Sequence, residues 1–169
     1  MFTFIAVILG IMILLICSFF LRKSCIYPVI NIQNGWSITH GDVTYQDVTL
    51  AASDIGVADL GDVYILAVRL PENSIPYACI SFRSINSAVD AYLDHEMIYT
   101  WGHRLALDGK MVPKGHQVIP LPADYAGKTL TIRLTSAQNR AFSGFSPVYL
   151  GSRQDLFFQA FSHSVFHLF

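Results

Sequence analysis

The stretch Ala88–Gly102, AVDAYLDHEMIYTWG, predicts a β-hairpin at the centre of the fold. Every second residue of Val89–Leu93 is apolar, which is the period of a strand with one buried face. Asp94 and His95 form the expected corner, and Met97–Tyr99 begins the return strand. The rest of the chain can be placed around this hairpin.

Short strand candidates separated by turn residues lie on both sides of the hairpin. They are Trp36–Ile38, Val43–Leu50, Val63–Leu70, Tyr77–Phe82, Gln117–Leu121, Thr129–Thr135 and Pro147–Gly151. The nearly continuous apolar run Val63–Leu70 predicts a central strand that is covered on both faces. Thr129–Thr135 alternates instead, as a strand with one buried face does. Roughly eight short strands with no long helical pattern between them predict an all-β fold, an antiparallel β-sandwich.

The N-terminus carries a separate membrane signal. Phe2–Leu21 is uncharged and almost wholly apolar, and about 20 helical residues span roughly the 30 Å hydrocarbon core of a bilayer. The stretch lacks the basic region and the A-x-A cleavage site of a secretory signal peptide. Ile16 is too large for the position before Cys17 in a lipoprotein cleavage box. We therefore expect a transmembrane anchor helix at residues 1–23 and a linker at residues 24–35.

The orientation of this anchor is ambiguous from charge. Arg22 and Lys23 directly follow the apolar run, and no lysine or arginine precedes it. The positive-inside rule would then place the rest of the chain in the cytoplasm. A first helix does not always decide topology, however, because later helices can override a bias of two charges.

Several segments of the sandwich region follow a pattern known from one family. The hairpin's first strand ends in Tyr92–Asp94 and is followed, after a short corner, by an apolar strand with a tyrosine. The further segments are Val118–Pro122, Ala126–Ile132, Phe142–Gly144 and Val148–Ser152. In their order and spacing, from about Trp36 to Asp155, they resemble the extracytoplasmic galactose-binding-like sensor domain of bacterial membrane signalling proteins, such as diguanylate cyclases and histidine kinases.

This resemblance implies a jelly-roll β-sandwich at residues 36–152, outside the cell membrane. It implies that residues 153–169 are an apolar helical tail, at the start of a seven-helix membrane region into which the chain would continue. The implied function is a membrane-tethered ligand-sensing module that binds a small molecule or a carbohydrate and signals through that membrane region. His95 departs from the family pattern, which usually has glycine there. If this corner needs a positive φ, histidine adopts it at some cost.

The tail has its own local signals. Ser152 is the expected N-cap of a helix, with Asp155 three residues further on. Five phenylalanines follow without a clean apolar stripe, and about fifteen helical residues fall short of a bilayer. His163 and His167 would share a helix face and could bind a metal ion. Since a third ligand is not evident, we interpret them as interfacial residues.

The sequence carries no recognisable catalytic or metal-binding motif. It lacks the P-loop, dinucleotide-binding, zinc-protease and nucleophile-elbow patterns, so we expect no enzyme activity, no cofactor and no metal site. The acidic loop with Asp54, Asp59 and Asp62 leaves a structural calcium site as an alternative to a solvated loop. The three cysteines form neither a disulfide framework nor a CxxC pair.

The candidate ligand-binding residues are Tyr99, Trp101, His103 and Arg104, which cluster where the second hairpin strand ends. Strand alternation places Tyr99 and Trp101 on the same face. If that face is outward, the two rings could stack on a sugar; if it is inward, they belong to the core. We interpret His116, at the start of another strand, as an ordinary surface histidine.

Composition limits the partners. The 169 residues are 53% hydrophobic and 14% charged, with a net charge of −1, so nothing points to nucleic acid. The membrane is the expected partner of the apolar ends. The leading hypothesis is therefore the extracytoplasmic sensing module. The alternative is a stand-alone structural or adhesive surface domain that binds a protein or a glycan. The sequence does not identify the ligand.

Overall fold

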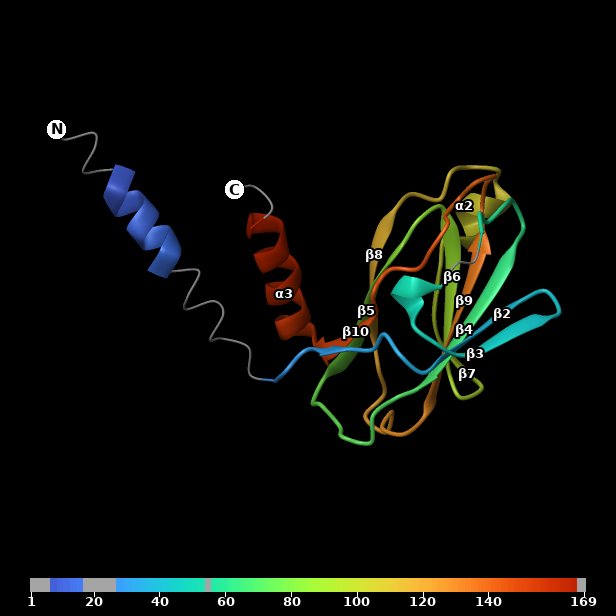
Figure 1. Cartoon of the computed structure of the whole chain (residues 1–169), viewed down its shortest axis with the longest axis horizontal. Coiled ribbons are helices and arrows are strands. Elements are labelled where there is room, and N and C mark those ends of the chain that lie inside the picture. Colours follow the sequence, from blue (N-terminus) through green and yellow to red (C-terminus); the bar gives the residue numbers. More distant parts are fainter. Residues whose placement is uncertain (1–6, 17–26, 54–55, 167–169) are drawn as a thin grey trace.

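The computed structural model describes residues 7–16, 27–53 and 56–166. Two antiparallel sheets pack face to face (Figure 1), which confirms the predicted antiparallel sandwich. The four-stranded sheet has the order β1 (Ile30–Asn31), β10 (Tyr149–Ser152), β5 (Ala78–Ser84), β8 (Gly115–Pro120). The six-stranded sheet has the order β3 (Val43–Val48), β2 (Trp36–His40), β4 (Val63–Arg69), β9 (Thr129–Ser136), β6 (Ser87–Leu93), β7 (Glu96–Trp101).

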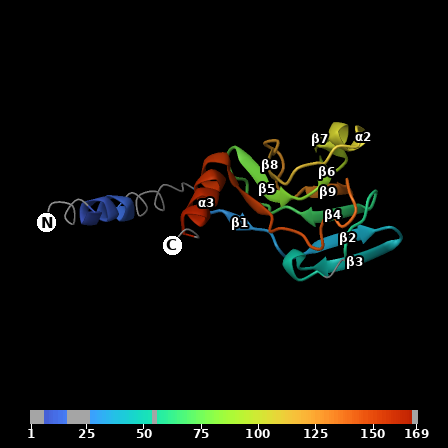
Figure 2. The same cartoon turned by 90° about the horizontal axis from the view of Figure 1, so that it is seen from above.

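Helical segments complete the described part of the chain. They are a helix at residues 7–16, the 3-10 turn η1 (Leu50–Ala52), α2 (His103–Leu107) and α3 (Arg153–Phe166). Helix α3 lies beside the four-stranded sheet, at the end of the sandwich where β1 joins it (Figures 1 and 2).

The core lies between the two sheets. Trp36, Tyr64 and Tyr125 are its largest fully buried side chains. The Trp36 indole also donates a hydrogen bond of 2.9 Å to the Ile32 carbonyl oxygen, which satisfies the one polar atom of the buried ring. In β9 the side chains of Leu130, Ile132 and Leu134 point inward, as the alternation predicts.

The central hairpin is confirmed as β6 and β7, but its corner differs from the expectation. The positive φ falls on Asp94, at 53°, and not on His95. Aspartate adopts this region more readily than most residues because its short polar side chain can bond locally. Here the Asp94 carboxylate accepts a hydrogen bond of 3.0 Å from the backbone N–H of Thr129 in the neighbouring strand β9.

The prediction for Val63–Leu70 is correct in position and wrong in burial. Strand β4 is central, between β2 and β9. Its inner side chains, such as Leu66, are buried, whereas Ile65 is 38% exposed and Arg69 is exposed. No described helix packs on the outer face of the six-stranded sheet here (Figure 2), so an apolar run alone did not indicate two covered faces.

Strand β5 is covered on both faces, as the first five residues of β6 in the other sheet are too. The first five residues of β5, Ala78–Phe82, are all buried, because α3 packs against β5 and β10 from outside. Gly151 of β10 makes this approach feasible. A Cβ placed there would lie 3.3 Å from the Val29 side chain and 3.4 Å from that of Leu156 in α3, tighter than ordinary packing distance.

The N-terminal predictions fall partly outside the described residues. Of the expected anchor Phe2–Leu21, the structure describes residues 7–16, which are helical and exposed. None of the helices in the described ranges is both long and apolar enough to cross a membrane. Within the expected linker, Ile30 and Asn31 form β1 and pair with β10. The predicted histidine pair of the tail involves side chains that are not described.

Candidate functional site

The four residues singled out in the sequence do not form one surface. Ala91 and Val89, the buried neighbours of Tyr99 and Trp101 in β6, place both rings on the inner face of β7. Both rings are partly buried and pack against the hydrophobic core. Of the two alternatives for the face that the rings share, the inward one is therefore correct. Arg104, on α2, is exposed. The role of these residues in ligand binding stays a prediction.

Tyr99 closes a polar bridge between the two sheets. Its hydroxyl donates a hydrogen bond of 2.7 Å to Gln117 Oε1 on β8. Gln117 Nε2 in turn donates a bond of 2.8 Å to Ser84 Oγ on β5. Burial raises the pKa of Tyr99 above its ordinary value. The Tyr99 hydroxyl therefore helps to link the two sheets at the edge of the sandwich.

His103 belongs to a different face. Its Nε2 lies 2.9 Å from Asp90 Oδ1, which also accepts a bond of 2.8 Å from the Thr100 hydroxyl. Asp90 is a buried acid on β6, 5% exposed, and these two partners satisfy it. The contact between His103 and Asp90 therefore holds α2 over the outer face of β6.

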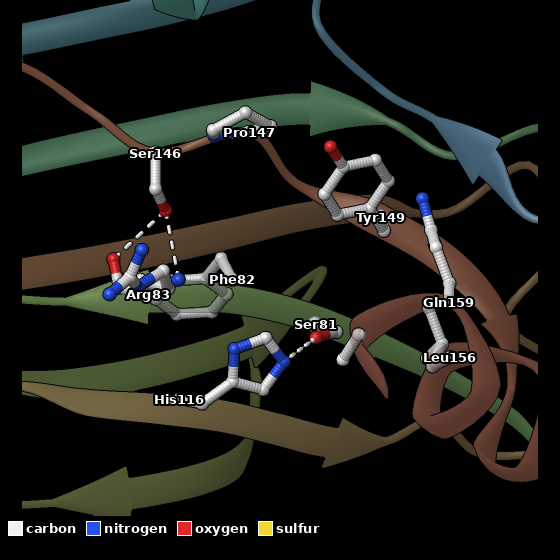
Figure 3. Close-up of a pocket in the computed structure, with 10 residues that line it drawn as sticks. Ser81, Phe82, Arg83, His116, Ser146, Pro147, Tyr149, Leu156 and Gln159 are labelled. Atoms are coloured by element: carbon white, nitrogen blue, oxygen red, sulfur yellow. Dashed lines mark hydrogen bonds between the residues drawn. The ribbon is translucent and has the colours of Figure 1, made fainter. Parts of the chain in front are cut away.

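A groove lies on the opposite side of the molecule, where α3 leaves part of the four-stranded sheet uncovered (Figure 3). Its volume is about 540 Å³, within the usual range for small-molecule sites. Ten residues line it: Ser81, Phe82 and Arg83 of β5, His116 of β8, Ser146, Pro147 and Tyr149 before and in β10, and Leu156, Gln159 and Ala160 of α3.

Strand register brings the polar side chains of the groove to one face. Arg83 lies directly opposite His116 on β8, and Ser81 lies opposite Tyr149 on β10. Because residues two apart on a strand and residues opposite on neighbouring strands share a face, all four point outward, toward α3. Phe82, between Ser81 and Arg83, points its ring into the core.

Ser81 and His116 are in hydrogen-bond contact, with 2.5 Å between Ser81 Oγ and His116 Nε2 (Figure 3). Ser81 is only 2% exposed. Partial burial, and then the positive charge of Arg83, lower the pKa of His116 below its ordinary value. A serine and a histidine alone do not make a hydrolytic triad, and none of the ten lining residues is a carboxylate that could orient the imidazole.

The backbone of Arg83 is held by two hydrogen bonds to one serine. Its N–H donates to Ser146 Oγ at 2.8 Å, and the same hydroxyl donates to the Arg83 carbonyl oxygen at 2.9 Å. Among the described residues, none forms an ion pair with Arg83. The guanidinium is therefore available to a ligand at the mouth of the groove.

Helix α3, which forms one wall, is anchored to the sandwich at its first turn. Ser152 Oγ accepts a bond of 3.2 Å from the Asp155 N–H, as the predicted N-cap does, and donates one of 2.6 Å to Asp155 Oδ2. The backbone N–H of Tyr27, from the segment before β1, donates to the same Oδ2 at 3.2 Å. The buried Asp155 thus joins both ends of the domain.

The described carboxylates of the acidic loop accept hydrogen bonds from backbone N–H groups. Asp62 Oδ2 accepts the Asp59 N–H at 2.8 Å, and Asp59 Oδ1 accepts the Arg140 N–H at 3.1 Å. Asp54 lies outside the described residues. Within the part of the chain that is described, histidines, cysteines and acids form no cluster of three suited to a metal ion.

Sequence reasoning missed the groove because its residues come from three separate strands and a helix. His116 was seen only as a surface residue, and Ser81, Arg83 and Tyr149 were not singled out. No signal in the local sequence could have found them. The run Tyr77–Phe82 is mostly apolar, but so is Val63–Leu70, whose outer face is exposed, so an apolar run does not indicate a covering layer.

Comparison with known proteins does not assign this chain to a family. No family model and no curated protein matches the chain. An FMN-binding β-glucuronidase from Facaelibacterium prausnitzii L2-6 aligns with 10% identity and a TM-score of 0.44, over 72% of this chain and 22% of the enzyme. The chain therefore spans about a fifth of that enzyme's length.

Two carbohydrate-binding modules also align. A family 35 module from an environmental isolate has 10% identity and a TM-score of 0.37, over 76% of this chain and 95% of the module. A carbohydrate-binding module of the β-sandwich superfamily has 11% identity and a TM-score of 0.31, over 74% and 54% of the two chains. Similarity at this level does not bear on the ligand of the present chain.

Proposed function

We propose that this chain is a membrane-tethered, extracytoplasmic module of a bacterial signalling protein, with a galactose-binding-like jelly roll that binds a small polar ligand and performs no chemistry of its own. The ligand occupies the groove between the four-stranded sheet and α3. The apolar N-terminal run Phe2–Leu21 serves as the tether, and the tail at residues 153–169, which begins with α3, leads back toward the membrane. A carbohydrate is the ligand class that the sequence resemblance favours.

One observation carries this proposal: a wall of the groove is the helix through which the chain leaves the sandwich. A ligand in contact with Gln159 and Ala160 touches α3 directly. The Asp155 bonds attach that helix to the segment before β1 as well. A bound ligand can therefore favour one position of α3 over another, which is what a sensor requires if the two positions differ in ligand affinity.

The ligand-binding part is tested by filling the groove. Ala160→Trp places an indole at its wall, and Ile65→Trp places the same ring on the exposed outer face of the other sheet as a control. Both full-length variants and the unmodified chain are titrated calorimetrically, in detergent micelles, with D-galactose and D-galacturonate. We expect Ala160→Trp to lose binding and Ile65→Trp to keep it. Equal affinities in the two variants would contradict a ligand site in the groove.

The extracytoplasmic part is tested by thiol labelling in intact cells. A cysteine replaces the exposed Asp108, which follows α2, in a chain whose three native cysteines are changed to serine. We expect this cysteine to react with a membrane-impermeant maleimide before lysis, because long segments are translocated largely regardless of nearby charge. Labelling that occurs only after lysis would place the sandwich in the cytoplasm and remove the external sensor.

A further inference from the structure

The polar residues of the groove have a common electrostatic character. Two of the ten lining residues, Arg83 and His116, can carry a positive charge, and none is an aspartate or a glutamate. The chain as a whole has a net charge of −1. The positive character of the groove is therefore a local feature, and it does not follow from the composition.

The two positive groups are placed to act on one ligand group. Arg83 and His116 are register partners on β5 and β8, and their side chains share the outer face. Side chains that are directly opposite on one face have Cβ atoms about 5 Å apart, so one carboxylate or phosphate can contact both. The charge of Arg83 is close enough to lower the pKa of His116.

The remaining lining groups suit a compact polar molecule rather than a bare ion. Tyr149 and Gln159 bring a hydroxyl and an amide to the other side of the groove, and Leu156 and Pro147 provide apolar surface (Figure 3). Hydroxyls on a ligand could bond the first pair, while a ring face could rest on the second.

We propose that the groove binds an anionic ligand, with its carboxylate or phosphate held between the Arg83 guanidinium and the His116 imidazole. This inference rests on the proposed function, in which the same groove is the ligand site. A guanidinium binds such groups in bidentate geometry and stays charged throughout the physiological range. None of the ten lining residues is an acid that would repel the negative charge of the ligand.

Affinity then depends on pH through His116. The groups beside its ring are Arg83 and Ser81 on β5. Tyr149 on β10 lies farther away, opposite Ser81, and the lining residues of α3 are neutral. A bound anion stabilises the protonated imidazole. Affinity should therefore rise as the pH falls toward the pKa of His116, until the ligand's own acid group becomes protonated.

The test compares ligands that differ only in charge. The full chain is titrated calorimetrically with D-galactose, D-galacturonate and inorganic phosphate. The variants are Arg83→Gln, Arg83→Lys, and Arg133→Gln as a control that removes the same charge from an exposed position on the other sheet. Each variant's melting curve is recorded, so that a loss of folding is recognised.

We expect D-galacturonate to bind more tightly than D-galactose. Arg83→Gln should weaken D-galacturonate binding by roughly tenfold to a hundredfold, as expected for the loss of a charge-assisted hydrogen bond. Arg83→Lys should restore part of this loss, and Arg133→Gln should change little. Phosphate that binds as tightly as D-galacturonate would still support an anion site, and would show that the sugar ring adds nothing.

Two other outcomes overturn the inference in different ways. If the two sugars bind equally and Arg83→Gln behaves like Arg133→Gln, the groove binds a neutral ligand; the anion site is then wrong, and the proposed function stands. If none of the three ligands binds the folded chain, the anion site falls together with the binding groove.

Discussion

The two sheets of this sandwich have similar inner faces and very different outer faces. Inside, both contribute buried apolar side chains to one core. Outside, the six-stranded sheet exposes Ile65 and Arg69 in its central strand β4, whereas α3 covers much of β5 in the four-stranded sheet. The groove lies on the outer face of the four-stranded sheet, which α3 covers in part. A second layer that stops short of covering a sheet is what creates a site here.

The largest expected effect separates the two faces of β4. Leu66→Asp buries an unpaired charge in the core, which costs several kcal/mol and is comparable with the whole stability of a domain. Ile65→Asp, one residue earlier on the exposed face, should cost less than about 1 kcal/mol. Urea unfolding of the two variants measures the difference. If both fail to fold, the outer face of β4 is covered in the native protein.

The next effect concerns the contact of α3 with the four-stranded sheet. Gly151→Val places side-chain atoms where a Cβ alone would already lie 3.4 Å from Leu156, and overpacking of this kind costs about 1–3 kcal/mol. Gly144→Val is the matched control, because no atom lies within 4 Å of a Cβ at that glycine. Urea midpoints should fall for the first variant only. Equal midpoints would mean that α3 does not rest on β10.

Asp155→Ala should loosen α3 without disturbing the core. It removes the carboxylate that accepts bonds from Ser152 and from the Tyr27 backbone, and losses of this kind at a helix N-terminus cost roughly 1–2 kcal/mol.

The readout for Asp155→Ala is the labelling rate of the Cys79 thiol. Cys79 is 4% exposed and lies opposite Gly151, on the face that α3 covers. Burial also raises the pKa of this thiol, against a smaller opposing effect of Arg153, so the native thiol reacts slowly. Asp155→Ala should accelerate labelling in a Cys17→Ser, Cys25→Ser background, and Asp155→Asn should do so less. An unchanged rate in Asp155→Ala would show that the hydrogen bonds of Asp155 do not hold α3 against the sheet.

The smallest effect is on acid stability. Partial burial and Arg83 lower the pKa of His116 in the folded state, so the folded protein binds this proton less readily than the unfolded chain does. Stability is therefore lost as the pH falls from the ordinary histidine range through the lowered pKa. His116→Gln should flatten this part of the melting-temperature profile, and His95→Gln, at the exposed hairpin corner, should not. Parallel profiles in all three proteins would contradict this assignment.

The sequence predicted those parts of the fold that depend on local pattern. Alternation identified β9 and the hairpin β6–β7, and turn residues separated the strands. Ser152 and Asp155 correctly indicated the start of α3. The burial of β4 could not be predicted in this way, because an apolar run does not tell whether a second layer covers its outer face.

The candidate site was harder to predict for the same reason. Tyr99 and Trp101 are neighbours in sequence, but their face became known only from the register with β6. Arg83 and His116 are far apart in sequence, and they meet because β5 pairs with β8 across the sheet. Such pairing depends on the topology, which local periodicity does not contain.

The most direct measurement compares these two candidate sites in one experiment. Backbone hydrogen exchange of the full chain is followed by mass spectrometry with and without D-galacturonate. The account predicts slower exchange in β5, β8 and the first turns of α3, which line the groove, and no change at residues 99–104. Slower exchange at residues 99–104, with the groove strands and α3 unchanged, would contradict it.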